Sequence, residues 1–320
     1  MPTDSSLWVN NGGVISSPKL SDYLRFSAQP LSRFRQFADA KEAFGKNIGD
    51  TFNWDKISNV STIGGLLVET STMPVSSQTV TKGTLTINEF GNSVPFTFKL
   101  DSLSKFKAEE MIDKGLRDDM VKVLDARVAA QFDATPLYYV GTSASGYALT
   151  TNGAATATNT SVLNSFHLMN MRLELEKRNV PMFDGDTFAM INSLEAQRSL
   201  EGAIESTQQY TENGYSKIAA GEVGILHNVR TIKDANASRY TYNLTTKTQT
   251  LKAWTGGNSL DGYMFGKDTV VEAVAVPEEI RAKEVTDYGR SKGMAWYFMG
   301  DWKIVWDDEP NARIIKWASA

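Results

Sequence analysis

Histidine, cysteine and paired acids are the residue types with which this chain could do chemistry, and it holds few of them. The sequence contains no cysteine and only two histidines, His167 and His227. Without cysteine there are no disulfides, thiolate zinc sites or cysteine nucleophiles. Neither histidine has a carboxylate at the spacing that a zinc site or a catalytic triad would use, so we interpret both as structural. We predict no metal, no cofactor and no enzyme activity.

Three further stretches approach binding motifs without completing them. Residues 262–269 resemble a phosphate loop, but the spacing is one residue short and Asp268 replaces the required hydroxyl. We expect a turn that enters a strand there. Residues 184–186 (Asp-Gly-Asp) have the composition of a turn and lack the closing glutamate of a calcium loop. Paired acids such as those in 307–309 could serve a glycosidase, although no particular pair stands out.

Charge and hydropathy limit the classes of partner. The chain has 33 basic and 37 acidic side chains, whereas a dedicated nucleic-acid binder concentrates positive charge. Weak, sequence-independent proximity to DNA stays open. No apolar run reaches the roughly 18–20 residues that span a bilayer, and residues 1–6 lack the pattern of a signal peptide. We therefore expect a soluble protein, cytoplasmic when synthesised, with no membrane partner.

Residues 50–100 are predicted to form short strands that have little apolar surface of their own to bury. Short alternating stretches at 51–54, 84–87 and 95–98 predict strands, separated by glycine-containing turns. Their serine and threonine content suits strands with wet faces. A two- or three-stranded arm of this kind is marginally stable alone, so we expect it to need a partner surface.

A long amphipathic helix is predicted to follow, from Asp101 to about Phe132. Apolar residues recur every four positions, at Ile112, Leu116, Met120, Leu124, Val128 and Phe132. About thirty helical residues would form a rod of roughly 45 Å, well above the usual helix length of about 11–12 residues. We interpret this helix as a spine.

The remaining elements are predicted from breaks and caps. A helix over 162–178 should end before Pro181, and Ser193 should cap a short helix through Leu200. An exposed loop or hairpin is expected at 141–161 and a mobile segment at 205–216. Strands are predicted at 187–191, 225–232, 239–244, 251–254, 270–276, 296–298, 302–306 and 313–317. We expect core packing rather than a sugar platform for the C-terminal tryptophans Trp254, Trp296, Trp302, Trp306 and Trp317.

The first fifty residues are predicted to form a loosely tethered arm. Pro18 suits the first turn of a short helix. Aromatic residues such as Phe34 and Phe37 alternate with Arg33 and Arg35. These anchors could lie on their own domain or on a neighbouring subunit, and the sequence leaves both open.

Five short motifs, in order along the chain, resemble those of one protein family. They are residues 66–74, with Glu69 and Pro74; residues 90–94; residues 180–191; residues 221–232; and residues 287–290 followed by Trp296. The pattern resembles the major capsid proteins of tailed bacteriophages (Hong Kong 97-type fold), in particular the branch that includes the N4-like podoviruses. Thr70 and Asn228 stand where that pattern has glycine.

The resemblance implies an α+β fold with a defined layout. Residues 1–49 would be an N-terminal arm and 50–100 an extended β-loop. A peripheral domain would combine 101–140, with the spine helix at 101–133, and 281–320 with long antiparallel strands. A mixed α/β axial domain would cover 141–280.

The implied function is a capsid subunit that self-assembles into the icosahedral shell of a virion around double-stranded DNA. Its partners would be other copies in hexamers and pentamers, a scaffolding protein and a portal, with a decoration protein left open. We expect contacts between subunits at Arg33, Arg35, Trp54, Glu69 and Phe90. Alternatives are a carbohydrate-active hydrolase, or a phage tail or surface-layer protein.

Overall fold

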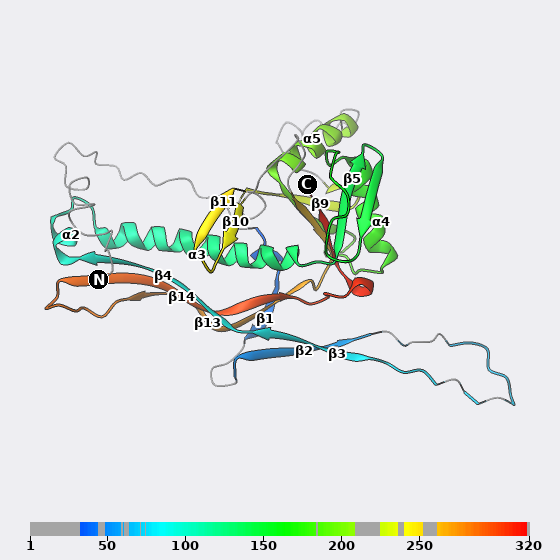
Figure 1. The fold of residues 1–320 in the computed structure, drawn as a ribbon, viewed down its shortest axis with the longest axis horizontal. Helices are drawn as coiled ribbons and strands as arrows, with labels where there is room; N and C mark the ends of the chain where they lie inside the picture. Colours follow the sequence, from blue (N-terminus) through cyan, green and yellow to red (C-terminus); the bar gives the residue numbers. More distant parts are fainter. Residues whose placement is uncertain are drawn as a thin grey trace.

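The computed structural model describes residues 33–43, 49–58, 60, 64–70, 72–73, 75–183, 185–208, 225–235, 240–251 and 261–318. It is a mixed α+β body from which one long hairpin extends (Figure 1). The elements are η1 (Arg35–Phe37), β1 (Asp39–Ala43), β2 (Thr51–Ile57), β3 (Val80–Thr86), β4 (Asn88–Thr97), α2 (Phe98–Leu103), α3 (Ala108–Asp133), β5 (Leu137–Ser143), β6 (Gly146–Thr150), α4 (Ser165–Lys177), β7 (Phe188–Ser193), α5 (Leu194–Gln208), β8 (Ile225–Leu226), β9 (Val229–Asp234), β10 (Tyr240–Asn243), β11 (Thr248–Leu251), β12 (Gly262–Phe265), β13 (Val270–Ala282), β14 (Ser291–Ile304), η2 (Glu309–Asn311) and β15 (Ile314–Trp317). No helix in these ranges is long and apolar enough to cross a membrane.

A four-stranded sheet, in the order β1-β13-β14-β4, carries the long helix α3 along its length (Figure 1). Side chains alternate along a strand, and β14 buries Trp296, Phe298, Trp302 and Ile304 in the core beneath α3. A charged contact ties the same two elements, because Arg127 of α3 makes two 2.8 Å hydrogen bonds to Asp301. The predicted core packing is confirmed for Trp296, Trp302 and Trp317, whereas Trp306 is half-buried and Trp254 lies outside the described residues.

The spine helix is confirmed as a long element, but its predicted start at Asp101 is wrong. A short helix, α2, ends at Leu103, and α3 begins only at Ala108. Ser104 closes α2 by donating its N–H to the carbonyl of Leu100, and its hydroxyl bonds the carbonyl of Phe106 at 2.5 Å. A serine that bonds nearby backbone in this way favours a turn over a continued helix. The 26 residues of α3 span roughly 39 Å.

A seven-stranded sheet in the order β6-β5-β15-β12-β7-β9-β8 forms the second half of the body. Every residue of β7 is buried, and the predicted cap at Ser193 is confirmed by a 3.2 Å hydrogen bond from the N–H of Ala196. The C-terminal strand β15 inserts between β5 and β12, and β13 belongs to the four-stranded sheet. Strand β13 runs across residue 280, and the division into peripheral and axial domains at that residue stays a prediction.

Several predicted boundaries need correction. The helix expected to end at Leu200 continues to Gln208, and the helix predicted from 162 begins at Ser165, where Asn164 caps it. The strand predicted at 225–232 is two short strands, β8 and β9. His227 and Asn228 turn the chain between them, with φ values of 50° and 58°. The hairpin allowed for at 141–161 exists as β5 and β6. The helix suggested at Pro18 lies outside the described residues.

Candidate assembly surface: the strap and its root

The hairpin that leaves the body is the most exposed part of the fold, and we call residues 51–86 the strap (Figure 1). Its strands pair in antiparallel register from Thr51 opposite Thr86 to Ile57 opposite Val80. Between them, residues 58–79 form a distal segment without helix or strand where the structure describes it. In β2, alternate side chains face the body, so that Phe52, Trp54 and Lys56 are half-buried and their neighbours are exposed.

A small apolar cluster fixes the root of the strap on β13. Leu85 of β3 and Ala273 of β13 are buried together, with Phe52, Trp54 and Ala275 packed around them. Trp54 lies directly across from Gly83, and a Cβ atom at residue 83 would overlap the indole ring. The glycine is therefore required by the close approach of that ring.

An ion pair adds a second, weaker attachment at the root. Lys56 Nζ lies 2.6 Å from Asp307 Oδ1 and 3.8 Å from Asp308, on the connection between β14 and β15. Partial burial alone would raise the pKa of Asp307, but the hydrogen bond from Lys56, a backbone hydrogen bond and the positive charges of Lys56 and Lys303 together lower it. A cavity of about 200 Å³ at this end of β2 is lined by Ile57, Trp306, Arg313 and five further residues.

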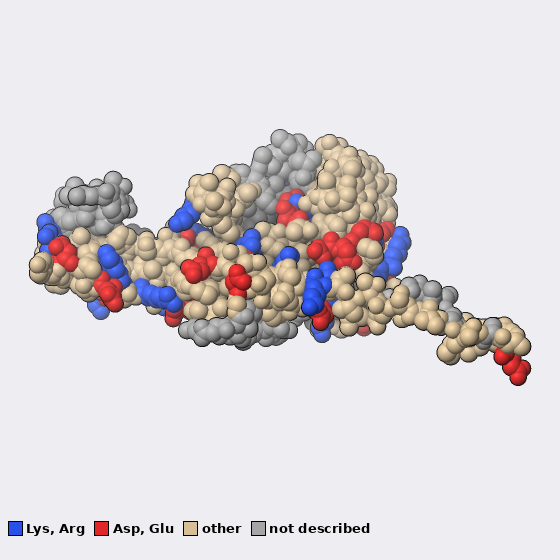
Figure 2. Space-filling view, turned by 60° about the horizontal axis from the view of Figure 1, so that its bottom comes forward, with Lys and Arg blue, Asp and Glu red and all other residues tan. Residues whose placement is uncertain are grey.

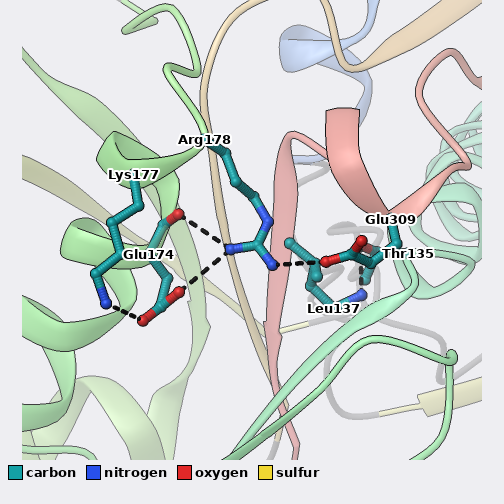
Figure 3. A network of polar contacts seen from close by, with 6 residues as sticks. All are labelled: Thr135, Leu137, Glu174, Lys177, Arg178 and Glu309. Atoms are coloured by element: carbon teal, nitrogen blue, oxygen red, sulfur yellow. Dashed lines mark hydrogen bonds and ion pairs between the residues drawn. The ribbon is translucent and has the colours of Figure 1, made fainter.

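Arg178, at the C-terminus of α4, holds the same connection from the other side (Figure 3). Its guanidinium donates to Glu174 Oε2 at 3.2 Å and to Glu309 Oε1 at 3.0 Å. Lys177 also donates to Glu174, at 2.8 Å. Nearby, the hydroxyl of Thr135 accepts from the N–H of Leu137 at 3.3 Å. The carboxylates that receive the strap are therefore carried by a connection that is itself braced.

The distal segment is nearly uncharged, and its apolar side chains are exposed where the structure describes them. Leu66 is 103% exposed, Leu67 61% and Val75 94%. Between Lys56 and Lys82 the only charged residue is Glu69. Figure 2 shows the strap as a mostly uncharged projection with an acidic group near its end. Exposed apolar side chains gathered in this way are typical of a contact surface.

The five predicted contact residues fall into two groups. Glu69 lies in an exposed turn of the distal segment. Trp54 packs at the root of its own strap, and Phe90 lies against its own core, with ring centroids 6.2 Å from Phe298 and 6.5 Å from Trp302. The structure brings Arg33 and Arg35 together but does not join all five residues into one site.

Arg33 and Arg35 belong to an anchor between the N-terminal segment and α3. Asp125, fully buried on α3, accepts hydrogen bonds from the N–H groups of Arg33 (3.2 Å), Phe34 (2.9 Å) and Arg35 (3.3 Å). Phe34 is buried in the core. The Arg35 side chain pairs with Glu272 at 2.8 Å and with Glu278. Burial would lower the pKa of Arg35, but these carboxylates raise it. Residues 33–35 therefore contact their own chain, and a contact of Arg33 or Arg35 with a neighbouring subunit stays a prediction.

Sequence reasoning missed the apolar side chains of the distal segment. Their spacing matches neither the period of a strand nor that of a helix, so the hydrophobic pattern does not assign them to a buried face. The available signal was the scarcity of charge between Lys56 and Lys82, in a chain with 70 charged side chains.

Neither histidine lies in a catalytic or metal-binding arrangement. The ring of His167 contacts the hydroxyl of Tyr139 at 3.1 Å and that of Ser161 at 3.2 Å, and burial lowers its pKa. His227 contacts the hydroxyl of Ser165 at 2.7 Å. Among the residues that the structure describes, no three His, Asp or Glu side chains are grouped to hold a metal ion.

The stretch at 262–269 consists of strand β12 (Gly262–Phe265) and a turn at 266–269 that enters β13, so the predicted turn is confirmed only for its second half. Asp268 has a φ of 58° and pairs with Arg313 at 3.0 Å. A Cβ atom at Gly266 would overlap the carbonyl of Pro181, so the turn is filled by protein. It offers no space for a phosphate.

Comparison with known proteins shows the fold without close sequence relatives. No family model and no curated protein matches the sequence. Among solved structures, the capsid of the cyanophage P-SCSP1u matches with a TM-score of 0.67 at 13% identity, covering 100% of this chain and 98% of that one. The head of the Helicobacter pylori bacteriophage KHP40 matches with a TM-score of 0.68 at 11% identity (97% and 96% covered). The capsid of Ralstonia phage GP4 matches with a TM-score of 0.63 at 15% identity (95% and 96% covered). The chain has the α+β fold of tailed-phage capsid proteins along its whole length.

Proposed function

We propose that this chain is a major capsid protein, which assembles into the icosahedral shell around a phage double-stranded DNA genome. The observation that carries the proposal is the strap: a projection with an exposed apolar end, on a body whose fold matches phage capsid chains over nearly their full length. The proposal includes the branch with the N4-like podoviruses, for which the motifs at 180–191 and 287–290 are the support. It also includes a scaffolding protein and a portal as assembly partners.

The strap can join one copy of the chain to the next. A projection that docks on a different surface of the next copy makes a head-to-tail contact, and such contacts close into rings when the rotation permits. Burial of a leucine or valine side chain contributes about 1.5–3 kcal/mol. Burial of Leu66, Leu67 and Val75 together can therefore contribute several kcal/mol to the free energy of association. The entropy lost when the distal segment becomes ordered offsets part of this contribution. Because Glu69 is the only charged residue of the distal segment, docking has a small desolvation cost.

The decisive experiment removes only the distal segment. Ile57 and Val80 pair directly, so an Asn-Gly turn can replace residues 58–79 and close the hairpin without disturbing β2, β3 or the root. We expect a folded chain with an unchanged melting temperature that no longer forms shells. Light scattering and negative-stain microscopy, with a scaffolding partner coexpressed where assembly requires one, give the readout.

A matched control makes the same change elsewhere. Asn243 and Thr248 pair at the end of the β10–β11 hairpin, so Asn-Gly can replace residues 244–247. This control should assemble like the unaltered chain. Shells formed equally well by the strap variant would contradict the proposal, and tubes or flat lattices from the unaltered chain would indicate a tail or surface-layer protein instead.

A further inference from the structure

Arginine supplies all the charge in the lining of the cavity at the end of β2. The volume of this cavity is about 200 Å³, and its charged lining residues are Arg178 and Arg313. The other lining residues are uncharged, namely Ile57, Asn179, Val180, Pro181, Trp306 and Asn311. The turn at 266–269 contributes no residue to the lining, so the cavity lies outside that turn. Two positive side chains thus line a small cavity that contains no acidic residue in its wall.

Three parts of the fold meet at this cavity. Arg178 is the C-cap residue of α4, from which it reaches toward the connection between β14 and β15 (Figure 3). Arg313 directly precedes β15, and Ile57 is the last residue of β2, where the paired part of the strap ends. A ligand in the cavity therefore contacts α4, the connection before β15 and the root of the strap.

Both arginines have N–H donors without an acceptor among the residues that the structure describes. Arg313 donates through Nη1 alone, to the carbonyl of Lys267 at 3.1 Å and to Asp268 at 3.0 Å. In Arg178, the buried Nε has no hydrogen-bond partner, whereas both Nη atoms bond to carboxylates. Burial lowers the pKa of Arg313, and the charge of Asp268 offsets only part of this effect. A partly buried guanidinium with unused donors favours a further anionic partner.

The volume and the donors together indicate a phosphate group. About 10–15 Å³ of such space holds one water molecule, so about 200 Å³ admits the five heavy atoms of phosphate and a substituent. Guanidinium groups match phosphate oxygens in geometry and bind them by charge-assisted hydrogen bonds. A phosphate group has enough oxygens to accept from both arginines at once.

We propose that this cavity is a binding site for a phosphate group, held by Arg178 and Arg313. Inorganic phosphate and the terminal phosphate of a nucleotide share this chemistry. The bound anion joins α4 to the connection before β15, beside the root of the strap. The site lies within one copy of the chain, so it does not depend on the proposed function and is tested on the unassembled chain.

Two substitutions at residues with positive φ change the charge around the site in opposite directions. Asn179 (φ 54°) lines the cavity, and Asn179→Asp adds a carboxylate to the lining. Asp268 (φ 58°) pairs with Arg313, and Asp268→Asn removes that competing charge. Asparagine and aspartate both tolerate this backbone region, so neither change strains its turn. Phosphate should bind at least about tenfold more weakly to Asn179→Asp and about threefold more tightly to Asp268→Asn.

Calorimetric titration with sodium phosphate, at constant pH and ionic strength, measures these affinities. Asn179→Gly is the matched control, because glycine keeps the backbone conformation and adds no charge; its affinity should stay within about threefold of the unaltered chain. Titration with thymidine monophosphate identifies the source of the phosphate group, with thymidine as the control. Tighter binding of the nucleotide than of phosphate assigns the site to nucleotides, and equal or weaker binding assigns it to inorganic phosphate.

The melting temperature gives an independent readout. Phosphate should raise it by about 2 °C for each tenfold concentration above the dissociation constant, in the unaltered chain and in Asn179→Gly. Phosphate also stabilises folded chains through its exclusion from protein surfaces, but that effect is the same in every variant. An equal rise in Asn179→Asp would therefore overturn the site. Unmeasurable binding to the unaltered chain, or weaker binding to Asp268→Asn, would overturn it as well.

Discussion

Replacing Asp125 by alanine should release the N-terminal segment from the spine helix. This buried carboxylate is the shared acceptor for the N–H groups of Arg33, Phe34 and Arg35. Alanine removes the acceptor without adding bulk. The matched control, Asp125→Asn, keeps an oxygen in nearly the same place but loses the charge.

The expected magnitude follows from the three hydrogen bonds. A hydrogen bond to a charged group stabilises by about 1.5–3 kcal/mol, but three donors that share one oxygen do not add fully. Phe34 is fully buried, so its N–H would be left unsatisfied at a cost of about 1–3 kcal/mol. We take about 3 kcal/mol in total for Asp125→Ala, which corresponds to a roughly 150-fold larger population of the detached segment. Charge-assisted hydrogen bonds are about twice as strong as neutral ones, so Asp125→Asn should give roughly tenfold.

Limited trypsin digestion measures this population directly. Cleavage after Arg33 and Arg35 requires the segment to detach, and its rate follows the open population when opening and closing are fast. Mass spectrometry of the released N-terminal fragments gives the rate, and urea unfolding reports the core separately. The order should be unaltered chain, Asp125→Asn, Asp125→Ala. Equal rates in the unaltered chain and Asp125→Ala would refute the reasoning, and equal rates in the two variants would show that the charge alone matters.

Three further changes probe the root of the strap and the buried histidine. Asp307→Asn removes the partner of Lys56; because this pair is partly exposed it should cost under about 1 kcal/mol, yet hydrogen exchange in β2 should accelerate. Gly83→Val should displace the Trp54 ring and lower stability by about 1–3 kcal/mol in urea, whereas Gly83→Val in a Trp54→Ala background should be milder. The lowered pKa of His167 keeps the folded state neutral while the unfolded state gains a proton below about pH 6.5, so stability should fall between pH 6.5 and 5, by at most about 2 kcal/mol. His167→Gln should remove that slope in urea midpoints measured at both pH values; an unchanged slope would assign it to other groups.

The fold could be predicted where periodicity is strong and could not where competing local contacts decide. The four-residue stripe identified α3, because one face of a long helix must be buried against β14. The break before Ala108 depends on hydrogen bonds of Ser104, which leave no trace in hydropathy. The placement of β15 between β5 and β12 was also out of reach, since a strand that is buried on both faces has no alternation to assign it to a sheet.

The site was harder to predict than the fold, for a related reason. A partly buried aromatic or arginine has the same sequence signature whether its partner lies in the same chain or in another. Phe90 and Arg35 are predicted as interface anchors; each has a partner within the chain, Phe298 and Glu272, and their contact with another copy stays a prediction. A scarcity of charged residues is a more informative signal of a contact surface, because an exposed segment without charged side chains loses little hydration when it is buried.

Two attachments of different strength fix the strap to the body at its root. Its root combines one apolar cluster around Leu85 with a partly exposed ion pair from Lys56 to Asp307. Exposed pairs of this kind contribute about 1 kcal/mol or less, close to thermal energy, whereas the cluster contributes more. The connection that carries Asp307 is itself held by the ion pair between Glu309 and Arg178. Of the two attachments at the root, the apolar cluster is therefore the stronger and the ion pair the weaker.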